Sequence, residues 1–126
     1  MIQEPDRASL HRLIRLLVCA SLALPTVSKA GLADELEDLV GYMIVAAKIV
    51  DGWKDGRKFG DGFEGCEHGR VIVFTDGTAL TCNTYSYSYS YRPTAVILAK
   101  QFKFQGREAY SFKMVIDDEV YDMSLR

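Results

Sequence analysis

The sequence predicts a mainly β domain, built as a small antiparallel barrel or sandwich of six or seven strands with one short N-terminal helix. Several runs rich in β-branched and aromatic residues alternate with polar residues, which is typical of strands with one buried face. Turn signals at Asp76-Gly77 and around Gly106 join such runs into hairpins. Alternation shows which side chains share a face, but it does not distinguish a barrel from a sandwich.

A short amphipathic helix opens the predicted domain. From Gly31 onward, acidic residues interleave with leucines at helical spacing, and Gly41 provides a stop. Residues 42–50 also fit a continuing helix, but Gly41 and the isoleucine and valine content favour a strand. We therefore expect a helix that is followed by a strand over residues 42–50.

Residues 51–65 contain five of the ten glycines in the chain, together with acidic and basic side chains. This composition predicts a long surface loop. A phosphate-binding loop would need glycine, lysine and then serine or threonine before a helix, and this pattern does not occur in the segment. The segment contains Trp53, the one tryptophan of the chain, and we include it among the candidate binding residues.

Two hairpins follow the glycine-rich segment. Residues 70–82 form the first, and a two-residue turn at Asp76-Gly77 would put Val71 opposite Cys82 on the core face. Residues 96–116 form the second, in which a loop at residues 105–107 would pair Phe102 with Tyr110, and a last short strand covers residues 120–123. The prediction is therefore a sequence of antiparallel neighbours.

Residues 1–30 have the features of a cleaved secretory signal. Arginines precede an apolar stretch at residues 16–24, and small residues stand three and one positions before a cut after Ala30. The stretch is too short to span a bilayer, so we expect no transmembrane anchor. The sequence thus predicts a signal peptide and a single β-rich domain at residues 31–126, located in a bacterial periplasm or outside the cell.

Signal removal would leave two cysteines, Cys66 and Cys82, in a compartment where disulfides persist. A bond between them would close a loop of about 16 residues and stabilise the domain by about 3 kcal/mol. Two separate buried thiols are the alternative. The formal net charge of −2, without a lysine or arginine cluster, argues against electrostatic binding of nucleic acid.

The most unusual feature is a row of tyrosines that alternate with serines, which we call the tyrosine ladder: Tyr85, Tyr87, Tyr89 and Tyr91. Their period of two places the four rings on one face of an extended segment. An unbroken strand from residue 78 would leave the rings opposite the buried Cys82 face, whereas a bulge at Asn83-Thr84 would bury them. The need for large core side chains favours burial, and exposure would create a binding surface for a protein, peptide or glycan.

An enzyme or metal protein centred on Cys66, His68 and the neighbouring acids Glu64 and Glu67 is the alternative function. A structural zinc site needs four ligands, and a disulfide would remove Cys66 from the set. The sequence contains no nucleophile motif with an identifiable activating base. It therefore predicts no catalytic residue, no metal site and no cofactor.

Four stretches carry a resemblance to known proteins: GYMIVAAKIVDGW (41–53), FEGCEHGRVIVF (63–74), DGT (76–78) and YSYSYSYRPTAVIL (85–98). They resemble stretches of small signal-bearing bacterial proteins of unknown function. The resemblance implies export and assigns no functional residue. The sequence as a whole favours an exported β domain that acts by binding or structural interaction over an enzyme.

Overall fold

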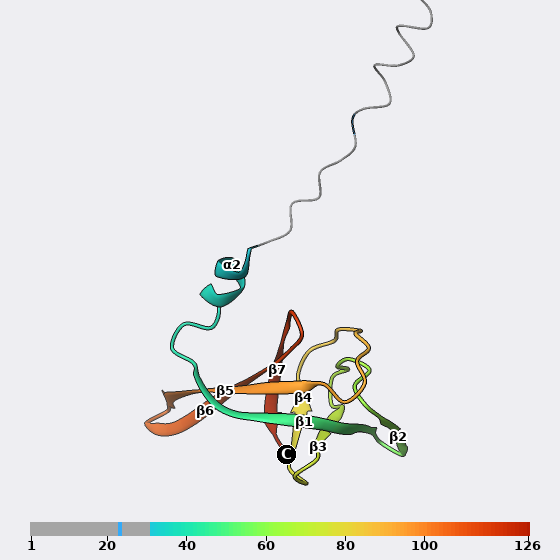
Figure 1. The fold of residues 1–126 in the computed structure, drawn as a ribbon. Helices are drawn as coiled ribbons and strands as arrows, with labels where there is room; N and C mark the ends of the chain where they lie inside the picture. The colour runs from blue at the N-terminus through green and yellow to red at the C-terminus, as the bar shows by residue number, and fades with distance from the viewer. Residues whose placement is uncertain (1–22, 24–30) are drawn as a thin grey trace, which may run out of the picture. The chain divides into compact units, whose positions relative to one another are not determined.

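The computed structural model describes Ala23 and residues 31–126 (Figure 1), so the predicted signal peptide lies, Ala23 apart, outside the described residues. The chain divides into two units, residues 1–37 and residues 38–126. The first unit contains α2 (Leu32–Glu37), which confirms the predicted short helix. No helix in the described part of the chain combines the length and the apolar character needed to cross a membrane.

The second unit is an antiparallel β barrel, which decides between the two predicted architectures. Its sheet has the order β2-β1-β3-β4-β7-β6-β5, and an additional pairing of β1 with β5 closes six of the strands while β2 stays outside the ring. The strands are β1 (Met43–Asp55), β2 (Lys58–Asp61), β3 (Val71–Phe74), β4 (Ala79–Cys82), β5 (Thr94–Phe104), β6 (Arg107–Ile116) and β7 (Glu119–Leu125).

Strand β1 closes the barrel because it pairs with different neighbours along its length. Its first half pairs with β5, and its second half lies between β3 and β2. Irregularities in register at residues 44–46 and 50–52 accompany this change of partner. The predicted strand over residues 42–50 is therefore confirmed, and it continues to Asp55.

The predicted surface loop over residues 51–65 is wrong in its first part. Residues 51–55 belong to β1, and residues 58–61 form β2. The glycines serve close packing here: a Cβ at Gly52 would lie only 2.4 Å from the carbonyl oxygen of Gly60 on the paired strand. A glycine-rich composition has the same appearance in a loop and in two strands that approach closely, so composition alone misled the prediction.

The register of the β3–β4 hairpin also differs from the prediction by one residue. Ile72 lies opposite Leu80, and Val71 lies opposite Thr81 instead of Cys82. The connection has three residues because Gly77 has a φ of +84°, and the Asp76 carboxylate accepts a hydrogen bond from the Thr78 amide at 2.9 Å. This extra loop residue turns Ile72 and Phe74 toward the core in place of Val71 and Val73.

For the β5–β6 hairpin, the prediction is wrong in the opposite direction, because the turn has one residue fewer than predicted. Gln105 and Gly106 both have positive φ, 50° and 75°, and form a two-residue connection. Phe102 consequently lies opposite Ala109 and not Tyr110. The last strand confirms its prediction and is longer, because β7 runs from Glu119 to Leu125.

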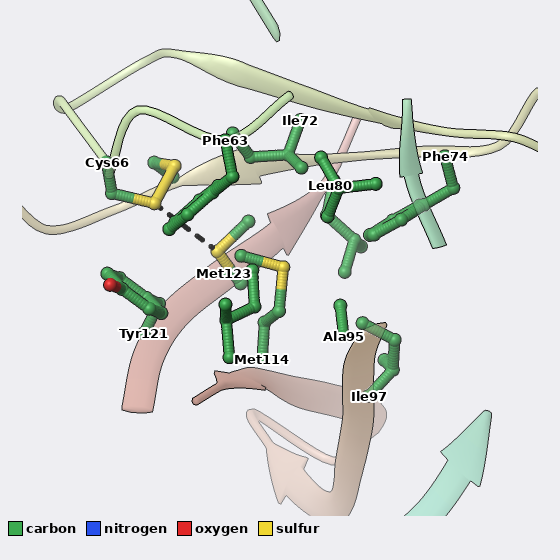
Figure 2. Close-up of a cluster of buried hydrophobic side chains, with 13 residues drawn as sticks. Phe63, Cys66, Ile72, Phe74, Leu80, Ala95, Ile97, Met114, Tyr121 and Met123 are labelled. Atoms are coloured by element: carbon green, nitrogen blue, oxygen red, sulfur yellow. Dashed lines mark hydrogen bonds between the residues drawn. A yellow bond between two sulfur atoms is a disulfide. The ribbon is translucent and has the colours of Figure 1, made fainter. Parts of the chain in front are cut away.

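The core lies inside the barrel and includes the predicted disulfide. Cys66 and Cys82 are bonded, with their Cα atoms 5.6 Å apart. Figure 2 shows Met123 beside this bond, with its Sδ 4.0 Å from the Cys66 Sγ; a disulfide sulfur carries no hydrogen, so we regard this as a van der Waals contact. The ring of Phe63 meets that of Tyr121 edge to face, with centroids 5.3 Å apart.

Candidate functional site

The tyrosine ladder is exposed. Its rings have exposed fractions of 74% at Tyr85, 76% at Tyr87, 65% at Tyr89 and 72% at Tyr91. The serines between them are only partly exposed. The expectation that the rings are buried is therefore wrong, and the alternative that they are exposed is correct.

The side-chain alternation of β4 explains this orientation. Leu80 and Cys82 are buried, and the even-numbered positions continue on the inner side through the serines. The chain does bend at Asn83-Thr84, where the Asn83 amide donates to the carbonyl of Asp122 at 2.9 Å. This bend redirects the chain without inserting a residue into the alternation, so the tyrosines stay outside.

Residues 85–91, which we call the ladder segment, are held along one edge by residues 63–66. Ser90 and Phe63 exchange two backbone hydrogen bonds of 2.9 Å, and Ser86 and Cys66 exchange two of 2.8 Å. Between these pairs lies Gly65, with a φ of +84°; a Cβ there would be 2.2 Å from the Ser86 carbonyl oxygen. Only glycine allows the two segments to approach this closely.

The inner side of the ladder segment is fixed by a shared carboxylate. Ser86 Oγ and the Tyr121 hydroxyl each donate a hydrogen bond of 2.8 Å to Glu119 Oε2. Tyr121 is 1% exposed, and this burial, followed by its hydrogen bond to Glu119, raises the pKa of its hydroxyl above the ordinary value. The shift favours the protonated hydroxyl, which is the form that donates to the Glu119 carboxylate.

Trp53, the other predicted binding residue, lies elsewhere. It is half-buried on β1 and packs against the core, and a Cβ at Gly60 would be 2.6 Å from its Nε1. The guanidinium of Arg70 covers the ring at 4.4 Å from its centroid. Trp53 is thus a supporting residue and does not share the exposed face of the ladder.

Arg70 is the residue that the sequence analysis missed. It is 8% exposed, and its Nη1 donates to the carbonyl oxygens of Glu64 and Gly65 at 3.2 and 3.3 Å. Its Nη2 lies 3.4 Å from Glu67 and 3.7 Å from Asp55. Arg70 thereby holds residues 64 and 65 in place. A single arginine before a strand gives no sequence signal for this role.

A pocket of about 90 Å³ adjoins one end of the ladder segment. It is lined by Arg70, by three residues that precede Arg70 in the chain, and by the first three residues of the ladder segment. The preceding residues are Glu64, Cys66 and Glu67, and the ladder residues are Tyr85, Ser86 and Tyr87. A pocket of this size has room for a side chain or a few waters and not for a cofactor. It extends the contact surface at the Tyr85 end.

The residues of the alternative enzyme site do not form a reactive group together. Cys66 is bonded to Cys82 and offers no free thiolate. His68 lies in an exposed turn, with Nδ1 3.2 Å from the carbonyl oxygen of Asn83. In residues 31–126, no cluster of three histidine, cysteine, aspartate or glutamate side chains could hold a metal ion.

Further aromatic side chains are exposed at residues 100–111, which we call the hairpin tip. Phe102, Phe104 and Tyr110 have exposed fractions of 41%, 62% and 55%. A groove of about 330 Å³ lies beside them. It is lined by Asn83, Phe102, Tyr110, Ser111, Phe112, Met123, Ser124 and Leu125.

The comparisons with known proteins give no match. No family model matches the chain, and no curated protein or solved structure is similar enough to match it. The function must therefore be argued from the geometry of the chain itself.

Proposed function

We propose that this protein is an exported binding domain that uses the tyrosine ladder as its contact surface for an extended polypeptide. The observation that carries the proposal is the exposure of four tyrosine rings, between 65% and 76%, on a segment whose other side is fixed. A ring on a backbone that is already held in place loses less entropy on binding, and it offers a flat apolar face with a hydroxyl at its end.

An extended polypeptide fits the ladder better than a compact ligand does. Rings on alternate residues of an extended chain repeat every 6 to 7 Å or so, which is also the side-chain repeat of any other extended chain. Recognition of one extended segment by another is a common mode of peptide binding. The pocket at the Tyr85 end is too small to take a sugar ring with its substituents.

The disulfide supports the exported setting. Bonds such as that between Cys66 and Cys82 form and persist in periplasmic and extracellular compartments, whereas cytosolic thiols are kept reduced. The predicted signal at residues 1–30 agrees with this location. A periplasmic or extracellular partner is therefore part of the proposal.

The test is to screen the purified, oxidised chain against a displayed library of random peptides and against a glycan array. We expect peptides to be enriched, and we expect their binding to be lost in the double variant Tyr87→Ser, Tyr89→Ser. The matched control is Phe104→Ser, which removes an aromatic ring of similar exposure, 62%, from the hairpin tip and should leave binding unchanged.

Three results would contradict the proposal. Glycan binding that the double variant abolishes would assign a different ligand class to the ladder. Peptide binding that survives the double variant would place the contact surface elsewhere. The absence of any binder in both screens would remove the basis for a binding function at the ladder.

A further inference from the structure

The ladder segment has one backbone edge that is not paired. Successive residues of an extended chain direct their N–H and C=O groups to opposite edges. Ser86 and Ser90 direct theirs to Cys66 and Phe63, so the tyrosines direct theirs to the other edge. Within the part of the chain that the structure describes, no backbone group forms a hydrogen bond with the backbone of the four tyrosines.

This edge also lacks two of the usual protections against pairing, charge and proline. Exposed edges in natural proteins are commonly interrupted by charged residues, by proline or by a bulge on the edge itself. Residues 85–91 contain only tyrosine and serine, and the first charge and the first proline follow at Arg92-Pro93. Neither a charge nor a proline within residues 85–91 therefore opposes pairing of this edge with another extended chain.

The ladder segment is complementary to itself. Its sequence, YSYSYSY, is the same in both directions, with Ser88 at its centre. Two copies in antiparallel orientation, related by a twofold axis at Ser88, place Tyr85 opposite Tyr91 and Tyr87 opposite Tyr89. All of these pairs present their free N–H and C=O groups to each other, which gives about eight hydrogen bonds across the axis.

We propose that the polypeptide bound by the tyrosine ladder is the ladder segment of a second copy of this chain. The inference rests on the proposed function and names the partner of the same surface. The pairing joins two barrels edge to edge and produces one continuous face of eight tyrosine rings, two rows of four. Cross-strand aromatic pairs of this kind are favourable.

The charges at the two ends of the ladder segment are complementary in this arrangement. Arg92 follows the Tyr91 end, and its side chain is about half exposed beside Asp51. Carboxylates lie near the other end: Glu64 and Glu67 line the pocket with Tyr85, and Glu119 accepts a hydrogen bond from Ser86. Antiparallel pairing brings Arg92 of each copy to the Tyr85 end of the other. Glu64 and Glu67 lie across the ladder segment from it, on the edge that is paired within the chain, so this attraction is long-range and weak.

The area available predicts a weak dimer. Four tyrosines exposed to the extent of 65% to 76% offer about 600 Å² per copy, and edge pairing buries only a part of this. Stable interfaces bury about 1,200 Å² or more in total. We therefore expect dissociation in the range of about 100 µM, so that local concentration would control assembly.

The first measurement is sedimentation equilibrium of the purified, oxidised chain from about 10 µM to about 1 mM, with amide hydrogen exchange at both limits. We expect a monomer–dimer equilibrium and slower exchange of the Tyr87 and Tyr89 amides at high concentration. The amides of Ser86 and Ser90 are bonded within the chain and should not change. A monomer throughout this range would overturn self-pairing.

Two variants at one position separate backbone pairing from ring contacts. Tyr87→Ala removes the ring and keeps the N–H, whereas Tyr87→Pro also removes the N–H from the free edge. We expect at least a tenfold weaker dimer for Tyr87→Pro than for Tyr87→Ala. Equal dissociation constants, with both chains folded by circular dichroism, would show that the copies associate elsewhere and would overturn the inference.

The same experiments distinguish this inference from the proposed function. A chain that stays monomeric but binds library peptides through the tyrosine ladder retains the proposed function and loses the self-pairing. A synthetic peptide with the sequence of residues 84–92 should compete with dimerisation at concentrations near the dissociation constant. Dimerisation that an excess of this peptide leaves unchanged would also overturn the self-pairing.

Discussion

The tyrosine ladder and the hairpin tip both expose aromatic side chains but differ in support. The ladder segment pairs with residues 63–66 on one edge, contacts Gly65, and is fixed from within by Glu119. At the hairpin tip, β5 and β6 pair only with each other, because β1 pairs with β5 as far as Ala99 and β7 pairs with β6 as far as Phe112. Exposure alone does not make a contact surface; an ordered support lowers the entropy lost on binding.

The strongest test of this support is Gly65→Ala. The new Cβ would lie 2.2 Å from the Ser86 carbonyl oxygen, at a φ of +84° that alanine adopts only with strain. We expect a loss of about 4 kcal/mol in the free energy of unfolding, from overpacking and backbone strain together. Urea denaturation with and without the substitution measures this loss.

Gly69→Ala is the matched control for Gly65→Ala. Gly69 has nearly the same φ, +88°, but a Cβ there would have no heavy atom within 4 Å. Backbone strain alone should cost about 1 kcal/mol. If both variants lose the same free energy of unfolding, the close contact between Gly65 and the ladder segment does not contribute to stability.

Removal of the disulfide should have the next largest effect. The double variant Cys66→Ala, Cys82→Ala removes the covalent bond that joins two residues 16 positions apart in the sequence. We expect a loss of about 3 kcal/mol, measured by urea denaturation of the oxidised protein and of the variant. A reducing agent should destabilise the natural chain and leave the variant unchanged; an equal response of both would contradict the role of this bond.

The hydrogen bond from the Tyr121 hydroxyl to Glu119 predicts that the protein loses stability at alkaline pH. The raised pKa of Tyr121 means that its protonated form is favoured in the folded state. This contribution is complete below the ordinary tyrosine pKa of about 10 and is lost as the pH rises above it. Tyr121→Phe should therefore make the free energy of unfolding depend less on pH above 10.

Ser86→Ala is the control for the alkaline effect. It removes the other hydrogen bond to Glu119 but keeps the buried phenol, so the loss of stability above pH 10 should remain. Both variants should cost about 1 to 2 kcal/mol at pH 7, because each removes a hydrogen bond to a carboxylate. An unchanged alkaline slope in Tyr121→Phe would assign the pH dependence to another group.

The sequence analysis predicted the fold class, both hairpins and the disulfide, because each depends on patterns over several residues. The registers of both hairpins were wrong by one residue, since each depends on the length of a turn. The φ of +50° at Gln105 and the hydrogen bond from Thr78 to Asp76 set those lengths, and neither follows from the turn dipeptides.

The candidate site was predictable only in part, for a related reason. Period two placed all four tyrosines on one face, but the choice between the inner and the outer face depended on the path of the chain at Asn83. The roles of Arg70 and Gly65 depend on a contact between residues 63–66 and the ladder segment, which are about 20 positions apart in the sequence. No local sequence pattern predicts a contact between segments that are so far apart in the chain.

The smallest effect on stability should come from the ladder itself, which sharpens its contrast with the hairpin tip and with Gly65. Tyr87→Ser with Tyr89→Ser removes two rings that are 76% and 65% exposed, and we expect a loss below about 1 kcal/mol in urea denaturation. A loss as large as that of Gly65→Ala would mean that the rings stabilise the barrel. A small loss would mean that the barrel holds these aromatic side chains in water without depending on them, which is the property expected of a surface maintained for contact with another chain.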